Sequence, residues 1–312
     1  MTVLSLTPTT LDDAMPPEMD TDEVADRVFV MCMQEETEYR IHDYLAASVA
    51  MRKQASKPVD EDCRVRMCEW CYQVVDFCKF RRETVGIGMS YLDRYLCTEQ
   101  GIDALCNRKI YQLAAMTALY IAIKIHEPLE METSLLADLS RGCYKEHEFV
   151  AMEQNILSAL NFRVNGPTPL GFVQHIMALI PRAVHPTVAS ILMDYARYQI
   201  ELAVSEQSFV DIRPSVIALA SVLNAIEGMD SSILPIKAQA KFIRNIEKYT
   251  GLPTDEVEIV QSKLSLLLVG MIDYDQALLT IDQHMRGADS IDDSSRKGDL
   301  LRRNSPKSVI RR

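Results

Sequence analysis

The sequence predicts an all-α protein made of two successive sets of five helices. Apolar residues recur at the spacing of amphipathic helices along most of the 312 residues, and no stretch alternates convincingly as a strand would. A hydrophobic fraction of 48% is enough to bury a core. Asn165, Gly166 and Pro167 interrupt the helical pattern near the middle of the chain. The halves on either side share no obvious sequence, so the duplication is inferred from the pattern alone.

Net charge and apolar run lengths narrow the classes of partner. The net charge of −11 disfavours non-specific binding to nucleic acid, which depends on neutralising phosphates. No apolar run reaches the roughly 18 residues of a transmembrane helix, and the N-terminus lacks the basic and apolar regions of a secretory signal. We therefore expect neither a nucleic-acid partner nor a membrane partner.

The eight cysteines fall mostly within helical patterns, which favours reduced thiols over a disulfide scaffold. Cys68 and Cys71 have the spacing of a metal-binding pair, but no second such pair and no histidine pair at ligand spacing accompanies them. Small apolar residues in a helix are the better interpretation. We expect no metal and no cofactor.

The N-terminal region divides into two expected segments. Residues 1–22 carry prolines and acids without hydrophobic periodicity, which predicts a disordered acidic segment, either a rapid-turnover signal or a solvated tail. Residues 23–57 are expected to form an N-terminal helical segment, with one helix over 24–47.

Residues 58–165 are expected to form the first five-helix fold. Its third helix is apolar on nearly all sides, which predicts that it lies buried. Thr133 is expected to cap the fourth helix, and a loop is expected between Gly101 and Asn107. The predicted helices span residues 62–80, 84–96, 109–126, 133–139 and 145–160.

Residues 166–285 are expected to form the second five-helix fold. Thr168 is a predicted cap and Pro169 a first helical residue. Residues 286–312 are expected to form a disordered basic tail. Three interpretations of this tail stay open: a nuclear-import signal, a kinase site at Ser305, and a segment that only keeps the protein soluble. The predicted helices of the second fold span residues 169–179, 186–204, 214–226, 236–249 and 254–274.

Both halves resemble the cyclin family, from about residue 62 to residue 274. The upstream stretch 38–45 is similar to the approach segment of D-type cyclins. The resemblance implies two tandem cyclin folds that bind and activate a cyclin-dependent Ser/Thr protein kinase as a heterodimer, without catalytic activity of their own. The matching segments are Cys-Arg-Val-Arg-Met-Cys-Glu-Trp at 63–70, Tyr-Leu-Asp-Arg-Tyr-Leu at 91–96, Ala-Ile-Lys at 122–124, Met-Glu at 152–153, Pro-Thr-Pro at 167–169 and Arg-Pro-Ser-Val-Ile-Ala at 213–218.

By this resemblance, Lys124 and Glu153 are the two charged anchors of the kinase contact. A cation in an apolar helix is costly unless it is paired, although a snorkelling lysine and a solvated glutamate are the simpler explanations when each is considered alone. Ile125 and Leu157 match apolar contact positions and fit a core equally well. Phe162 follows the helix and is the best candidate for an aromatic anchor.

Two further sets of residues follow from the resemblance. Arg64 and Asp93 match an internal ion pair that ties the first helix to the second. Four residues match a shallow groove that docks Arg-x-Leu peptides of kinase substrates and inhibitors. Its usual apolar and acidic positions are changed here, so we expect ordinary docking to be weakened or replaced, which a peptide-binding measurement would test. The groove residues are Arg66, Met67, Trp70 and Gln73.

The subtype and the competing functions stay open at this point. No Arg-x-x-Leu destruction motif occurs, which weakens the assignment to the mitotic cyclins. No Leu-x-Cys-x-Glu motif occurs either, which weakens the assignment to the D-type cyclins. We expect a G1 or G1/S regulator of the nucleus and cytoplasm. The alternative is a cyclin-fold regulator in transcription or nutrient signalling that binds a different kinase or a transcription factor. A helical-repeat scaffold is less favoured because equal short repeats are missing, and an enzyme least because no motif surrounds the scattered histidines.

Overall fold

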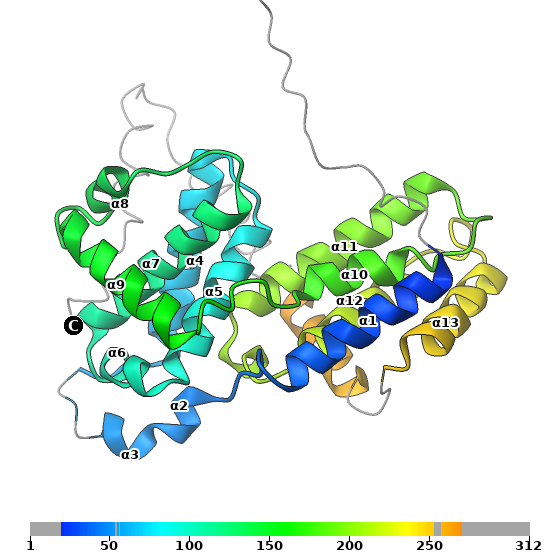
Figure 1. Ribbon diagram of the computed structural model, residues 1–312. Helices are drawn as coiled ribbons and strands as arrows, with labels where there is room; N and C mark the ends of the chain where they lie inside the picture. Colours follow the sequence, from blue (N-terminus) through cyan, green and yellow to red (C-terminus); the bar gives the residue numbers. More distant parts are fainter. Residues whose placement is uncertain (1–19, 54, 56, 253–256, 270–312) are drawn as a thin grey trace, which may run out of the picture.

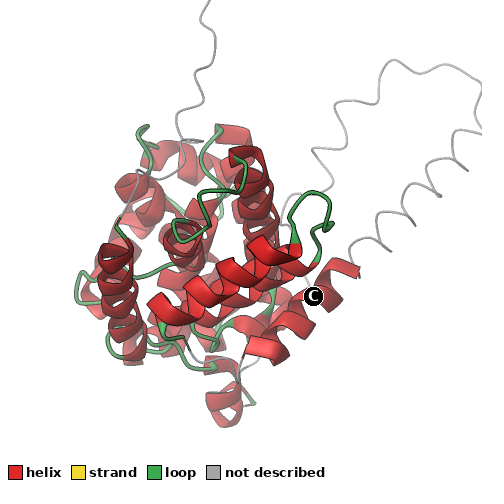
Figure 2. Cartoon of the chain, turned by 90° about the vertical axis from the view of Figure 1, so that its right-hand side faces the viewer, coloured by secondary structure: helices red, strands yellow, loops and turns green. Residues whose placement is uncertain are grey.

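The computed structural model describes residues 20–53, 55, 57–252 and 257–269. Within these residues the secondary structure is helical and no strand occurs, which confirms the all-α prediction (Figures 1 and 2). No helix among them is long and apolar enough to span a membrane. The predicted acidic segment 1–22 falls almost entirely outside the described residues, and the basic tail with Ser305 and the end of the last predicted helix fall wholly outside them.

The first fold surrounds one buried helix, α7. This helix contacts both α5 and α9, and nearly all of its residues between Tyr111 and Ile123 are buried. Gly88 of α5 lies against the backbone of Leu119, where a Cβ atom would come within 3.0 Å of the Leu119 Cα atom. The helices of this fold are α4 (Glu61–Cys78), α5 (Glu83–Leu96), α6 (Ile102–Cys106), α7 (Arg108–His126), α8 (Thr133–Leu139) and α9 (Glu146–Ala159).

The second fold repeats this plan around α12, which contacts α10 and α11. Each of these three helices begins with a proline, whose fixed φ suits the first helical position. Thr168 accepts a hydrogen bond from the Gly171 amide, so the predicted cap is confirmed. The helices are α10 (Pro169–Met177), α11 (Pro186–Ser205), α12 (Pro214–Glu227), α13 (Ile236–Thr250) and a last helix that the structure describes over 257–269.

The single helix predicted over 24–47 is wrong. The structure has α1 (Thr21–Glu36), then a non-helical stretch over 37–43, then the short helices α2 (Tyr44–Ala47) and α3 (Val49–Arg52). Asp43 ends the interruption by accepting hydrogen bonds from the first amides of α2.

The two parts of this N-terminal region belong to different folds. Helix α1 lies alongside α10 and α13 of the second fold, where Val24 and Val28 are fully buried in its core (Figure 1). Tyr44 and Leu45 of α2 belong instead to the core of the first fold.

Two smaller expectations in the first fold also differ from the structure. The loop expected between Gly101 and Asn107 contains α6, whose Ala104 and Leu105 are buried. Thr133 is the first residue of α8 rather than its cap, and its hydroxyl donates to Glu146 instead. Short helices and caps of this kind depend on tertiary contacts more than on local spacing.

Candidate functional site

The candidate site centres on an ion pair between two packed helices. Lys124 lies in the last turn of α7 and Glu153 near the middle of α9. The Lys124 ammonium lies 2.7 Å from the Glu153 carboxylate, with 42% and 15% of the two side chains exposed. The predicted anchors therefore meet each other at the surface, where solvent and a partner can both reach the lysine.

Three features favour the charged form of Lys124. The hydrogen bond to Glu153 raises the pKa of Lys124 against the opposing effect of partial burial. The Lys124 ammonium also lies 5.1 Å from the centre of the Tyr120 ring one turn earlier, and a cation is favoured at the C-terminal end of a helix. The ammonium is therefore held charged and pointing outward.

Apolar residues lie close to this pair along the chain: Ile125 follows Lys124, Leu157 lies one turn after Glu153, and Phe162 follows α9. Ile125 is 42% exposed and Phe162 is 70% exposed, whereas Leu157 is half-buried against the core. Of the three predicted apolar contact residues, the structure thus presents two openly and one in part.

An unusual backbone conformation places Phe162 outward. Asn161 and Phe162 have φ angles of 51° and 56°, in the left-handed region that non-glycine residues seldom adopt. The Phe162 amide donates to the Leu157 carbonyl at 2.9 Å, which closes the end of α9. Such conformations cost about 1–3 kcal/mol and persist only where surrounding structure enforces them.

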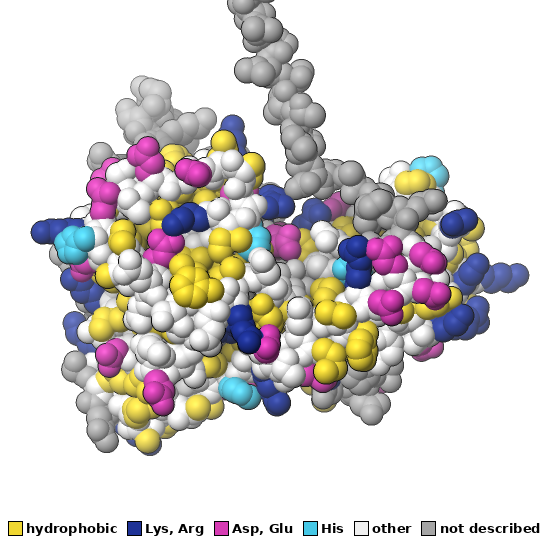
Figure 3. Space-filling model, in the orientation of Figure 1, with side chains coloured by type: hydrophobic (Ala, Val, Ile, Leu, Met, Phe, Trp, Pro, Cys, Tyr) yellow, Lys and Arg dark blue, Asp and Glu magenta, His cyan; other side chains and the backbone are white. Residues whose placement is uncertain are grey.

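Sequence analysis missed two other exposed apolar residues near the pair. Val150 precedes Glu153 by one turn on α9 and is 42% exposed, and Leu129 follows α7 and is 66% exposed. Figure 3 shows hydrophobic side chains gathered on this face of the first fold. The spacing of apolar residues along α9 does not indicate whether Val150 is buried or exposed. Its exposure becomes apparent only in the folded structure.

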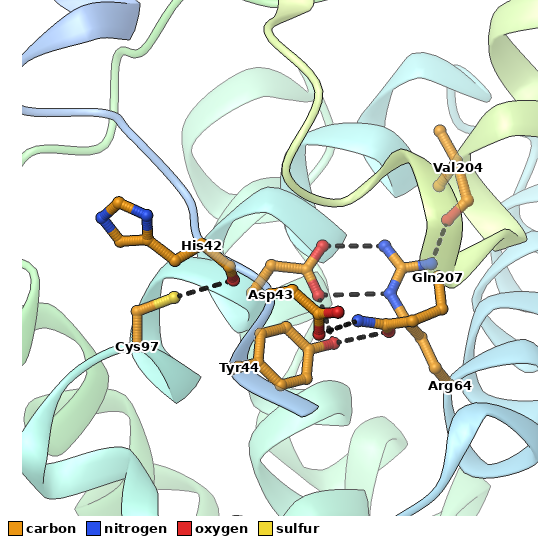
Figure 4. Close-up of polar contacts among 8 residues, drawn as sticks. His42, Asp43, Tyr44, Arg64, Cys97, Val204 and Gln207 are labelled. Atoms are coloured by element: carbon orange, nitrogen blue, oxygen red, sulfur yellow. Dashed lines mark hydrogen bonds and ion pairs between the residues drawn. The ribbon is translucent and has the colours of Figure 1, made fainter. Parts of the chain in front are cut away.

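Arg64 and Asp93 form a second ion pair, which is buried. The Arg64 guanidinium contacts both Asp93 oxygens, at 3.2 and 2.7 Å, and the two side chains are 4% and 5% exposed. Arg64 also donates to the Val204 carbonyl of α11, and the Tyr44 hydroxyl donates to Asp93 at 2.8 Å (Figure 4). The pair therefore joins α2, α4 and α5 of the first fold to α11 of the second.

The surroundings of this buried pair keep its charges satisfied. Burial alone would lower the pKa of Arg64, but the charge of Asp93 raises it above its ordinary value. Gln207 extends the network because its amide donates to Asp43 at 3.2 Å (Figure 4). A charge pair this deeply buried needs such additional partners to offset its desolvation.

The four residues matched to a docking groove on α4 do not share one environment. Arg66 and Gln73 are exposed, whereas Met67 is fully buried and Trp70 is 5% exposed. Phe77, one turn after Gln73, is 75% exposed. The open surface of α4 therefore carries Arg66, Gln73 and Phe77, and Met67 and Trp70 support it from within the core.

The thiols of α4 lie in apolar surroundings. Burial raises the pKa of Cys63 to about 11 and that of Cys68 to about 12, and burial also raises the pKa of Cys71. Thiols of this kind stay protonated near neutral pH, and only the thiolate binds metal. Among the described residues no group of three or more His, Cys, Asp or Glu side chains is placed to hold a metal ion.

A cavity of about 890 Å³ lies between the two folds. The Arg82–Glu201 ion pair, at 2.7 Å, and a hydrogen bond from Thr168 to Glu83, at 3.1 Å, connect the folds at its walls. Sequence patterns did not indicate this cavity, because its walls come from segments far apart in the chain.

Two protein-family models match most of the chain. The model "Cyclin, N-terminal domain" matches residues 28–165, and "Cyclin, C-terminal domain" matches residues 167–284. These matches include both charged pairs, α1 from Val28 onward, and the whole of the second fold.

Curated proteins and solved structures give the same family names. A G2/mitotic-specific cyclin-B3 from Gallus gallus is 26% identical over 246 residues, covering 79% of this chain and 54% of that protein. A G1/S-specific cyclin-D1 from Homo sapiens is 26% identical over 185 residues, covering 59% of this chain and 60% of that protein. The chain thus spans less than two thirds of either relative. A viral cyclin from herpesvirus saimiri shares the fold, with a TM-score of 0.55 and 19% identity over 79% of this chain and 97% of that one.

Proposed function

The chain belongs to the cyclin family, and on that premise we propose that it is the non-catalytic regulatory subunit of a cyclin-dependent Ser/Thr protein kinase. It binds the kinase as a heterodimer and activates it. The observation that carries this proposal is the exposed Lys124–Glu153 pair, with the exposed Ile125 and Phe162 close to it along the chain.

The pair suits a contact with the mobile helix of a kinase. The Lys124 ammonium has further N–H groups to donate to backbone carbonyls of a partner, and Glu153 has a second oxygen to accept from backbone amides. Holding that helix inward lets the kinase's own Lys–Glu pair orient the ATP phosphates. The subunit therefore acts by binding the active arrangement of the kinase more tightly than the inactive one.

Charge alone is too weak for this task. Moving a kinase from 1% to 99% active requires a preference of about 10⁴-fold, or about 5.5 kcal/mol, whereas an exposed ion pair contributes about 0–1 kcal/mol. Burying a fully exposed side chain of this size contributes about 1.5–3 kcal/mol. Ile125 and Phe162, which are 42% and 70% exposed, contribute the corresponding fractions of that value. The apolar neighbours thus supply most of the affinity, and the charged pair sets the orientation.

We place the activity at G1 or G1/S, in the nucleus and cytoplasm. For the timing, support comes from the 26% identity to a G1/S-specific cyclin-D1 and from the absence of an Arg-x-x-Leu motif in the sequence. The equal identity to a G2/mitotic-specific cyclin-B3 makes the mitotic phase the alternative. The open surface of α4, with Arg66 and Gln73, is the site we propose for kinase substrates and inhibitors.

The test is capture of a kinase from native lysate by three forms of the full chain. These are the wild type, Lys124→Ala/Glu153→Ala, and the control Arg27→Ala/Glu23→Ala, which removes an exposed ion pair of equal length on α1. We expect the wild type and the control to recover a Ser/Thr kinase that phosphorylates a histone substrate. The Lys124/Glu153 variant should recover at least tenfold less activity, because the groups of the kinase that these two residues contact would be left buried and unpaired. It should keep its helical circular dichroism.

Two outcomes would contradict the proposal. In one, all three proteins recover the same partners in the same amounts. In the other, none recovers a kinase, which would favour a cyclin-fold regulator that binds a transcription factor.

A further inference from the structure

The outward face of α13 carries four cations in a single stripe. Phe242 and Ile246 point the other way and are fully or almost fully buried. The cations recur at intervals of four, three and four residues, which places them on one side of the helix, and all four are exposed. This α13 stripe consists of Lys237, Lys241, Arg244 and Lys248.

The stripe repels itself. Like charges three or four residues apart on a helix destabilise it by about 0.2–0.5 kcal/mol per pair, and the stripe contains three such pairs in succession. No ion pair joins a stripe cation to an acid within the described part of the chain. Glu247, the one acid within α13, is exposed three residues after Arg244 at the edge of the stripe. The helix therefore keeps an excess of three positive charges in a protein of net charge −11.

Helix α11 of the same fold has the opposite design. The three charges of α11 alternate in sign. Arg197 pairs with Asp194 on the same helix at 3.3 Å, and Glu201 pairs with Arg82 of the first fold at 2.7 Å. Each charge of α11 therefore has a partner of opposite sign, and the α13 stripe departs from that pattern.

We propose that the α13 stripe is a docking surface for an extended acidic segment of a partner protein. Along a helix axis, steps of three and four residues advance about 4.5 and 6 Å. Side chains on one face of an extended chain are about 6.5–7 Å apart. The spacing of the extended chain is longer by about 0.5–2.5 Å per step. The long, flexible Lys and Arg side chains span this difference, so that carboxylates at alternate positions of an extended segment each reach a stripe cation. The proposal does not rest on kinase binding, because α13 belongs to the other fold from Lys124.

The residues at the two ends of the stripe differ from those at its centre. Ile233 and Ile236, exposed by 50% and 71%, lie beside Lys237 and offer apolar contact to the segment. At the other end Lys248 donates to the Tyr249 hydroxyl at 3.0 Å and lies within the electrostatic influence of Asp22. The central cations therefore carry the recognition.

Acids beside the stripe disfavour a broad anionic surface such as a membrane. Helix α1 packs against α13 and exposes Asp22, Glu23 and Asp26 in its first turns. Figure 3 shows acidic side chains beside basic ones at this end of the second fold. A flat anionic surface that reached the stripe would meet these acids as well, whereas a narrow peptide avoids them.

The test measures binding of a fluorescent peptide of alternating Glu and Ser to the full chain by anisotropy. A peptide of alternating Gln and Ser, phosphatidylserine vesicles and a single-stranded DNA oligonucleotide serve as comparison probes. The variant Lys241→Glu/Arg244→Glu reverses the centre of the stripe. The control Lys53→Glu/Arg182→Glu makes the same change in net charge at exposed positions elsewhere.

We expect the wild type and the control to bind the acidic peptide with dissociation constants within twofold of each other. The stripe variant should bind at least tenfold more weakly. The new acids at 241 and 244 attract the remaining Lys237 and Lys248 but repel each other and Glu247. The helical circular dichroism and melting temperature of the variant are therefore measured beside its binding. We expect both to match those of the control, which separates a loss of binding from a loss of fold.

The proposal is overturned if the stripe variant and the control bind the acidic peptide equally, or if the wild type does not bind it. It is also overturned if the Gln–Ser peptide binds as well as the acidic one. Tighter binding of the wild type to the vesicles or to the DNA would assign the stripe to another class of partner.

Discussion

The first fold contains two ion pairs that have the same length and opposite surroundings. The closest contacts of Arg64–Asp93 and Lys124–Glu153 are both 2.7 Å. The first pair is almost completely buried and is joined by Tyr44 and the Val204 carbonyl, whereas the lysine of the second is 42% exposed. Distance therefore does not separate the structural pair from the pair that we propose for binding, but burial and the number of additional partners do.

The difference follows from the cost of desolvation. When a buried charge loses its partner, no water can take the place of that partner. Breaking the pair is therefore costly, and the pair stays formed. An exposed charge exchanges its partner for water or for another protein at little cost. Arg64 and Asp93 thus hold the two folds together, and Lys124 and Glu153 remain available to a partner.

The largest expected effect comes from Asp93→Ala, which leaves the Arg64 guanidinium buried without its counter-charge. We expect the free energy of unfolding to fall by about 3–5 kcal/mol, measured by urea denaturation. Lys124→Ala is the matched control and should cost less than about 1 kcal/mol. Equal losses for the two variants would remove the distinction between the pairs.

Glu35 extends the comparison to a buried carboxylate that is held by hydrogen bonds rather than by an ion pair. Its partner is Ser215 at the start of α12. Its oxygens accept from the Ser215 amide at 2.9 Å and from the Ser215 hydroxyl. Burial raises the pKa of Glu35 above its ordinary value of 4.5, and the Ser215 hydrogen bonds oppose the rise. The folded state therefore binds this proton more readily than the unfolded state does.

The stabilising contribution of Glu35 protonation is complete below pH 4.5 and is lost as pH rises through the folded-state pKa. Glu35→Gln removes the titration while keeping a side chain of the same shape. In urea unfolding at a series of pH values, the wild type should lose stability relative to the variant as pH rises above 4.5. A difference that does not change with pH would show that Glu35 does not titrate differently on folding.

The smallest expected effect is the coupling between Lys124 and Glu153 in the isolated chain. A double-mutant cycle of the two alanine variants should give an interaction energy of about 0.2–1 kcal/mol in urea unfolding. The Arg27–Glu23 pair on α1, also 2.7 Å long and about half exposed, provides a matched cycle. A coupling above about 2 kcal/mol would place Lys124–Glu153 among the structural pairs.

Local signals predicted much of this fold. Pro169, Pro186 and Pro214 each begin a helix as expected, and Thr168 caps α10. The apolar run of α7 correctly indicated a buried helix. The break after Glu36 was not visible, because the stretch 37–43 contains neither glycine nor proline.

The arrangement of the candidate site could not be predicted from the sequence. Resemblance named Lys124 and Glu153 as contact residues, which stays a prediction, and their mutual hydrogen bond depends on the packing of α7 against α9. The positive φ of Phe162 and the exposure of Val150 have no local sequence signal. Spacing placed Trp70 on α4 without revealing that it faces the core.

Helix α1 packs on segments that are synthesised long after it. Glu35 of α1 and Ser215 of α12 are separated by 180 residues in the chain. The core that receives Val24 and Val28 therefore does not exist until α10, α12 and α13 have followed. Contacts this distant in sequence form slowly and leave apolar surface exposed meanwhile. During synthesis the apolar face of α1 therefore stays unprotected until the second fold has been made.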